Sequence, residues 1–231
     1  MLQDPLITPY IKVKCLYIGN LRNIMKFDSV ILAGGQSLRM GQDKGLMEYH
    51  SPTAESSGIQ LDETKVASFN CKPMVAWVSD SLLGSQHLWV NTNEHKQAYE
   101  HLGFVTIKDV LHPDIGPLAG PLLGILTGLQ AAKSDWVLFS PCDTPNLPAN
   151  YPDVMTQFAC DNVSYANVVF DGKRRQNLHL LLHRSLAEDL QMYLLSGGRK
   201  TYQWLERVNT KDVDFSAQTA AFKNINSPED M

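Results

Sequence analysis

Short apolar segments alternate with helix-forming segments over the first two thirds of this chain. Strands are predicted at 29–32, 87–90, 104–107 and 136–140, and helices at 73–83, 94–101 and 121–132. Parallel strands need such helical connections, and the helices then cover both faces of the sheet. The pattern therefore predicts an α/β fold with a mostly parallel central sheet.

The last third of the chain departs from this alternation. Apolar segments at 165–170 and 178–182 flank Asp171-Gly172, a pair typical of a tight hairpin turn. Helices are predicted at 185–195, ended by Gly197-Gly198, and at 201–208. We therefore expect a small antiparallel part at the C-terminal end of the sheet.

Two segments lie outside the pattern. Residues 1–25 have no clear periodicity and are predicted to be a poorly ordered N-terminal extension, so the domain spans 26–231. Residues 50–70 are polar and are predicted to be a loop insertion, which is unusually long for a compact domain.

Composition narrows the class of protein. The chain has 231 residues and a net charge of −4, so it can bury a full core and has no overall attraction for nucleic acid. Its four scattered cysteines fit a reducing cytoplasm rather than a disulfide framework or a zinc site, and Cys142 is expected to be small and buried rather than a nucleophile. The uncharged segment 115–132 could just span a membrane, but its prolines and its glycines at every fourth position favour a buried helix close to the sheet.

The run VILAGGQSLRMGQDK (30–44) joins a strand directly to paired glycines and two cations. Gly34 and Gly35 would let phosphate oxygens approach the backbone amides. Arg39 and Lys44 could neutralise charge during phosphoryl or nucleotidyl transfer. The spacing matches neither a P-loop nor a dinucleotide-binding fingerprint, and a plain strand-to-helix turn would need only the glycines. The run predicts a loop that holds a nucleoside triphosphate, with both cations in catalytic roles.

Other polar residues follow the predicted strands or the last loop. In PCDTP (141–145), Asp143 could bind Mg²⁺ at the carboxyl edge of the sheet, or it could cap the next helix. Asn226 could offer an oxygen to the same metal or serve as a terminal cap. Asn91 and Asp109 each end a strand, and the Asp109 carboxylate could accept two hydrogen bonds from guanine or simply end a loop.

The chain resembles the molybdenum cofactor guanylyltransferases from about residue 26 to the end, without the insertion. The resemblance lies in the glycine run and in GPLAG (116–120), PCDTP (141–145) and NINSPE (224–229). Ala33-Gly34-Gly35 resembles the guanylyl branch, whereas cytidylyl relatives usually have Ala-Ala-Gly. The chain departs from the family in its long insertion and at Gln176-Asn177, where relatives often have a proline after the Gln or His.

The resemblance implies a three-layer, Rossmann-like nucleotidyltransferase fold. It implies an enzyme that transfers GMP from GTP to the terminal phosphate of molybdenum-molybdopterin and releases pyrophosphate. Mg²⁺ would be held by Asp143 with help from Asn226. The implied nucleotide-binding residues are Leu32, Ala33, Gly34, Gly35, Lys44, Asn91, Asp109 and Asp143.

Three other functions are compatible with the residues. They are a CTP-dependent molybdopterin cytidylyltransferase, a sugar-phosphate guanylyltransferase, and a non-catalytic nucleotide-binding carrier of the cofactor. The expected partners are GTP, molybdenum-molybdopterin, and proteins of cofactor biosynthesis or molybdoenzyme maturation. We expect a cytoplasmic monomer that binds neither nucleic acid nor membrane.

Overall fold

A seven-stranded sheet forms the centre of the computed structural model, which describes residues 25–34, 43–50, 71–110, 112–116, 120–226 and 230. β5, β4, β1 and β6 are parallel neighbours, β8 is antiparallel to both β6 and β7, and β9 is parallel to β7. The predicted mostly parallel sheet with a small antiparallel part is confirmed. In spatial order the strands are β5 (Val105–Ile107), β4 (Leu88–Asn91), β1 (Phe27–Leu32), β6 (Trp136–Pro141), β8 (Arg175–His183), β7 (Ala166–Phe170) and β9 (Lys211–Asp214).

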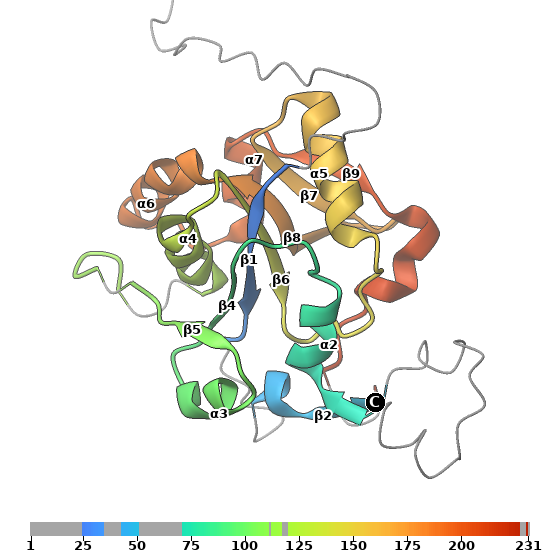
Figure 1. Cartoon of the computed structure of the whole chain (residues 1–231). Helices are drawn as coiled ribbons and strands as arrows, with labels where there is room; N and C mark the ends of the chain where they lie inside the picture. Colours follow the sequence, from blue (N-terminus) through green and yellow to red (C-terminus); the bar gives the residue numbers. More distant parts are fainter. Residues whose placement is uncertain are drawn as a thin grey trace, which may run out of the picture.

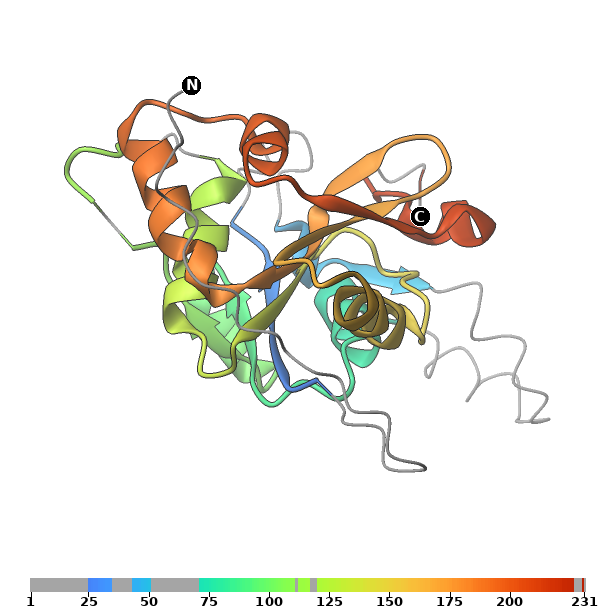
Figure 2. The same ribbon diagram turned by 90° about the horizontal axis from the view of Figure 1, so that it is seen from above.

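Helices cover both faces of the sheet (Figures 1 and 2). On one face, α4 (Pro121–Ala131), α6 (Ala187–Leu195) and α7 (Thr201–Arg207) share a core with Val30 and Phe139. On the other, α2 (Met74–Asp80), α3 (Lys96–His101) and α5 (Tyr151–Asn162) share a core with Ile31 and Leu138. Successive strand residues point to opposite faces, so neighbours in β1 and β6 fall into different cores. The expected three-layer fold is confirmed.

The glycines of α4 allow it to lie close against the sheet. A Cβ added at Gly128 would lie 2.6 Å from Cε1 of Phe139, and one added at Gly124 would lie 3.1 Å from Cγ of Asn91. The first distance is shorter than real Cβ contacts and the second is tighter than most of them, so an alanine at either position would force its neighbour to move. The predicted buried helix is confirmed, and within the described residues no helix is both long and apolar enough to cross a membrane.

The ends of the polar insertion are held together by a two-stranded stem. β2 (Glu48–His50) pairs antiparallel with β3 (Cys71–Pro73), and Tyr49 lies opposite Lys72. The indole Nε1 of Trp77 donates a hydrogen bond to the carbonyl of Tyr49 at 2.9 Å. The expectations made for 51–70 and for the extension 1–24 concern residues outside the described part of the chain.

Several predicted boundaries were wrong by a few residues. The helix predicted at 73–83 runs only from Met74 to Asp80, with Pro73 preceding its first residue. The helix predicted at 94–101 begins at Lys96, because His95 has a left-handed backbone with a φ of 54°. A 3-10 turn, η3 (Arg184–Leu186), precedes α6 where a continuous helix was expected. The sequence analysis missed α5 and β9 entirely.

The turns predicted from glycine are confirmed. Gly172 in the β7–β8 hairpin and Gly197 after α6 both have a φ of 89°. The Asp171 carboxylate accepts hydrogen bonds from the backbone N–H groups of Lys173 and Arg174, each at 2.8 Å. A left-handed backbone of this kind is readily adopted by glycine and strained for other residues.

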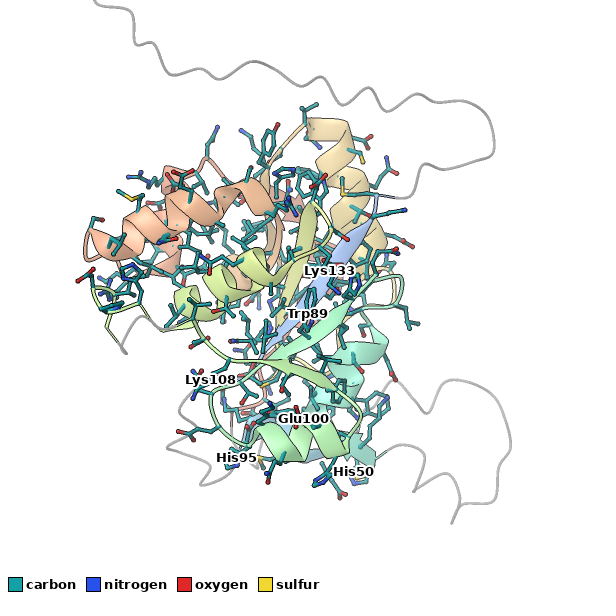
Figure 3. The ribbon with its side chains drawn as sticks, turned by 60° about the vertical axis from the view of Figure 1, so that its left-hand side comes forward. His50, Trp89, His95, Glu100, Lys108 and Lys133 are labelled. Carbon is teal, nitrogen blue, oxygen red and sulfur yellow. The ribbon has the colours of Figure 1, made fainter. Side chains whose placement is uncertain are left out.

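A buried carboxylate holds the amino end of the sheet. Asp28 accepts hydrogen bonds from the backbone N–H groups of Lys133 at 2.7 Å and Ser134 at 2.8 Å. Burial alone would raise the pKa of Asp28, but these bonds and one with His87 outweigh it and lower the pKa. A cleft of about 350 Å³ lies at this end, lined in part by Lys133 and Trp136. Lys133 marks this amino end, whereas His95 follows the carboxyl end of β4, and Figure 3 shows the two residues far apart.

Candidate active site

The carboxyl ends of β1, β4 and β6 meet at one edge of the sheet. Leu32 at the end of β1 pairs with Asn91 of β4 on one side and Pro141 of β6 on the other. The backbone N–H of Ala33 donates to the carbonyl of Asn91 at 2.9 Å, which extends the β1–β4 pairing by one residue. Gly34 therefore leaves the sheet between the loops that follow β4 and β6. The predicted site residues Gly35 and Arg39 lie outside the described residues.

The lysine cluster consists of Lys44, Asp143 and Asn226, which come from three separate parts of the chain. The Lys44 ammonium Nζ lies 3.1 Å from Oδ2 of Asp143 and 2.7 Å from Oδ1 of Asn226. The backbone N–H of Ile225 donates to the carbonyl of Asp143 at 2.8 Å, which fixes the C-terminal segment beside the loop after β6. The structure thus brings together three residues that the sequence analysis singled out.

The alternative that Asp143 caps the next helix is wrong. In the described segment 120–226, the helix that follows Asp143 begins only at Tyr151. The carboxylate of Asp143 accepts a hydrogen bond from Lys44 instead. Residues 227–229, where a helix start was predicted after Asn226, lie outside the described residues.

One oxygen of Asp143 has no hydrogen-bond partner among the described residues. This oxygen, Oδ1, is buried, and Lys44 reaches only Oδ2. A buried carboxylate oxygen of this kind is costly unless a cation or a donor reaches it. Together with Oδ1 of Asn226 it offers the oxygen ligands that Mg²⁺ prefers. The described residues gather no group of three or more His, Cys, Asp or Glu, so an ion here would keep positions for phosphate oxygens and water.

The turn that carries Lys44 is anchored by α3. In η1 (Lys44–Leu46), the Asp43 carboxylate accepts hydrogen bonds from the backbone N–H of Gly45 at 3.0 Å and from the hydroxyl of Tyr99 at 2.6 Å. Tyr99 is fully buried, and burial raises the pKa of its hydroxyl far above the usual range, so the group remains a donor. A side chain at Gly45 would collide with that hydroxyl, which explains the glycine. Sequence analysis missed the role of Tyr99.

The amide cluster consists of Asn91, Asn93 and Asp109, at the ends of β4 and β5. Nδ2 of Asn91 donates to Oδ1 of Asp109 at 2.8 Å, and Nδ2 of Asn93 donates to Oδ2 at 2.7 Å. The backbone N–H of Asp109 also donates to Oδ1 of Asn93 at 3.1 Å. Two predicted residues therefore meet, and a third, Asn93, was missed although it follows Asn91 by only two positions.

The amide cluster adjoins the glycine turn. A Cβ added at Gly34 would lie 3.6 Å from Oδ1 of Asn91 and 3.7 Å from Nδ2 of Asn93. This cluster lies on the β4 side of β1, and Asp143 of the lysine cluster follows β6 on the other side. Such a site could accept a ligand with a hydrogen-bonding base at one end and a polyphosphate at the other.

Buried side chains support the loop that carries Asp143. Oγ1 of Thr144 lies 3.0 Å from Nε2 of His179 on β8, and both residues are buried. Burial lowers the pKa of His179 to about 3, so its ring is neutral at physiological pH. Cys142 is also buried, and burial raises the pKa of its thiol well above the usual range. The prediction that Cys142 is a small buried residue is confirmed.

Solved structures share this fold. The molybdopterin-guanine dinucleotide biosynthesis protein A of Archaeoglobus fulgidus is similar with a TM-score of 0.62 and 20% identity, over 88% of this chain and 94% of that chain. CMP:2-keto-3-deoxy-manno-octonic acid synthetase, complexed with CTP, has a TM-score of 0.57 and 14% identity over the same shares of the two chains. At these identities the likeness shows the fold alone.

Sequence relatives show the family. Residues 29–211 match the model of the MobA-like NTP transferase domain. A molybdenum cofactor guanylyltransferase from Serratia proteamaculans is 35% identical over 202 residues, which cover 87% of this chain and 90% of that protein. The one from Shewanella sediminis is 34% identical over 207 residues, covering 89% and 93%. This chain therefore belongs to the MobA-like NTP transferase family.

Proposed function

We propose that this chain transfers the GMP unit of GTP to the terminal phosphate of molybdenum-molybdopterin, forming the guanine dinucleotide cofactor and releasing pyrophosphate. The lysine cluster is the observation that carries the proposal, because it places an ammonium and a carboxylate together beside a glycine turn. The names of the relatives in Serratia proteamaculans and Shewanella sediminis support the nucleotide and the acceptor. We place the reaction in the cytoplasm, which the few, scattered cysteines of the sequence favour.

The transfer needs alignment of two anions more than covalent help from the protein. An acceptor phosphate oxygen forms a new bond to the α-phosphorus of GTP, and the bond to the β-phosphate breaks, with its electron pair leaving on pyrophosphate. Alignment and neutralisation of charge therefore supply most of the rate. We assign these tasks to Lys44 and, from its place in the glycine run, to Arg39.

Asp143 and Asn226 are the proposed ligands of Mg²⁺. The buried, unpartnered Oδ1 of Asp143 and the amide oxygen of Asn226 are hard donors suited to this ion. When bound, the ion would neutralise charge on the phosphate oxygens. Lys44 now contacts both ligands, and its long flexible side chain could turn from them to a phosphate.

The amide cluster is the proposed base site. An ionised carboxylate can accept hydrogen bonds from N1–H and the 2-amino group of guanine together, whereas cytosine has no such neighbouring pair of donors. Asp109 would therefore favour GTP over CTP. We propose that Asn91 contacts the rest of the nucleotide. The residues at and after the end of β1 would contact it too, namely Leu32, Ala33, Gly34 and Gly35.

The test is product formation from Mg²⁺, GTP and molybdenum-molybdopterin, with CTP and a sugar phosphate as competing substrates. Lys44→Ala and Asp143→Asn should each lower turnover by about 10²- to 10³-fold, the usual cost of losing one group that stabilises transition-state charge. Lys72→Ala and Asp80→Asn are matched controls, because this surface ion pair links the insertion stem to α2 and should leave turnover unchanged.

Each alternative outcome has a distinct meaning. Near-full guanylylation by either Lys44→Ala or Asp143→Asn would refute the site assignment. Turnover with CTP in place of GTP would favour the cytidylyltransferase, and a guanylylated sugar phosphate would favour the sugar-phosphate enzyme. Tight GTP binding without any product would favour the non-catalytic carrier.

A further inference from the structure

Asn93 and Asp109 form a reciprocal pair of hydrogen bonds. The Asn93 amide Nδ2 donates to Oδ2 of Asp109 at 2.7 Å, and its Oδ1 accepts from the Asp109 backbone N–H at 3.1 Å. One side chain thus holds both the backbone and the carboxylate of the same residue, 16 positions away in sequence. The bond to the backbone fixes Asn93 relative to Asp109, and the bond to Oδ2 then restricts the rotation of the carboxylate.

The carboxylate of Asp109 is held at both oxygens. Asn91 donates to Oδ1 at 2.8 Å, while Asn93 donates to Oδ2. Each ionised carboxylate oxygen has about two acceptor positions, so one position is left on each oxygen. The two remaining positions match the two neighbouring N–H donors on the Watson–Crick edge of guanine.

We propose that Asn93 is a positioning residue for base selection, which holds Asp109 in the orientation that accepts guanine. The proposal rests on the proposed function, because that function makes GTP the substrate. Asn93 would act through Asp109. The base that Asp109 then selects is a purine with adjacent imino and amino donors.

A purely structural role for Asn93 is the competing explanation. The backbone N–H of Thr92 donates to the carbonyl of Ile107 at 3.0 Å, so β4 and β5 are still paired just before the amide cluster. Oδ1 of Asn93 continues this pairing by accepting from Asp109. That role needs only the acceptor atom, whereas the bond from Nδ2 to the carboxylate adds nothing to strand pairing. The position next to Gly34 also puts Nδ2 at the glycine turn rather than at a distant loop.

Two substitutions separate these roles. Asn93→Ala removes both bonds, and Asn93→Asp keeps an acceptor for the Asp109 N–H but sets a second carboxylate against the first. Asn93 is exposed, so neither change opens a cavity in the core. Asn162→Ala is the matched control, since among the described residues the side chain of this exposed residue on α5 donates to its own helix, to the carbonyl of Phe158 at 2.9 Å.

The measurement is the dissociation constant of GTP and of ITP, which lacks the 2-amino group, by titration calorimetry in Mg²⁺ buffer. The wild-type chain should bind GTP more tightly than ITP. Asn93→Ala and Asn93→Asp should each reduce this preference by about 10-fold, the loss expected for one hydrogen bond to a charged group. Asn162→Ala should keep the wild-type preference, and urea unfolding should show that all variants are folded.

An unchanged preference in Asn93→Ala, within about twofold, would overturn the proposal and leave Asn93 a structural role. Equal binding of GTP and ITP by the wild-type chain, or binding of neither, would overturn it as well. The proposed function fails by a different readout, namely no guanine dinucleotide from wild-type enzyme with Mg²⁺, GTP and molybdenum-molybdopterin. The two failures are therefore distinguishable.

Discussion

Replacing Gly124 of α4 by alanine should harm nucleotide binding more than folding, and the same change at Gly128 should do the reverse. The new methyl group at 124 would overlap Oδ1 of Asn91 and lie 3.1 Å from its Cγ. At 128 it would lie 2.6 Å from Cε1 of Phe139 and 3.0 Å from Cγ2 of Val30. The two variants thus add the same methyl group to the same helix, but against different neighbours.

The magnitudes follow from what each neighbour can do. Both variants gain about 1 kcal/mol of helix propensity. Overpacking a rigid core typically costs about 1–3 kcal/mol. At 124, however, the obstacle is the end of the Asn91 side chain, which can rotate, so the free energy of unfolding should change by less than about 1 kcal/mol. Rotation of Asn91, however, breaks its 2.8 Å bond to Asp109. Losing one hydrogen bond to a charged group, about 1.5–3 kcal/mol, would weaken GTP binding by about 10- to 100-fold.

At 128 the obstacles are the fully buried ring of Phe139 and a strand side chain, which have nowhere to move. We expect Gly128→Ala to lose up to about 2 kcal/mol of stability, after the gain in propensity, and to keep its GTP affinity within about twofold. Urea denaturation measures the first quantity and titration calorimetry the second. Wild-type GTP affinity in Gly124→Ala, or an equal loss of affinity in Gly128→Ala, would refute the reasoning.

Two further predictions concern buried groups. Tyr99→Phe removes the hydroxyl that holds Asp43, so the turn that carries Lys44 is no longer fixed. The single-turnover rate should fall about 10-fold with little change in GTP affinity, because Lys44 is misplaced. An unchanged rate would show that the contact does not position Lys44. Burial lowers the pKa of His179 from 6.5 to about 3, so on acidification the unfolded chain takes up the proton before the folded one does. The contribution of His179 to the free energy of unfolding is therefore full above about pH 6.5 and is lost as the pH falls from there to about 3. Between pH 6.5 and 4.5 the loss should be about 2 kcal/mol by urea denaturation, and His179→Gln should lack this component; the same pH dependence in both proteins would contradict the assignment.

The parallel half of the sheet could be predicted because its strands are apolar segments separated by helices and glycine turns. α5 was missed although Tyr151, Met155 and Ala159 are buried and spaced four apart, because only four of its 12 residues are buried and polar residues stand between them. β9 was missed because only Val213 of its four residues is buried. Both elements form against surfaces built by other parts of the chain, and local pattern carries little of that information.

The site could be predicted only where polar residues end strands or follow glycines. Lys44 and Asp143 stand 99 residues apart, yet each has a local signal, and parallel topology then brings them to one edge. Asn93 contacts Asp109, which is 16 positions away in the sequence, and Tyr99 contacts Asp43, which is 56 positions away. An exposed asparagine and a helical tyrosine have no local feature that indicates such partners, so the structure was needed to find them.

The central claim is that one triphosphate is cleaved at its α-phosphorus between the glycine turn and the lysine cluster. Purified protein should be incubated with Mg²⁺, molybdenum-molybdopterin and GTP carrying a radioactive label at either the α- or the γ-phosphate. The account predicts that the α-label appears in the pterin product and the γ-label in pyrophosphate, in equal amounts. Release of the γ-label as inorganic phosphate, or an α-label that stays in free nucleotide, would contradict it.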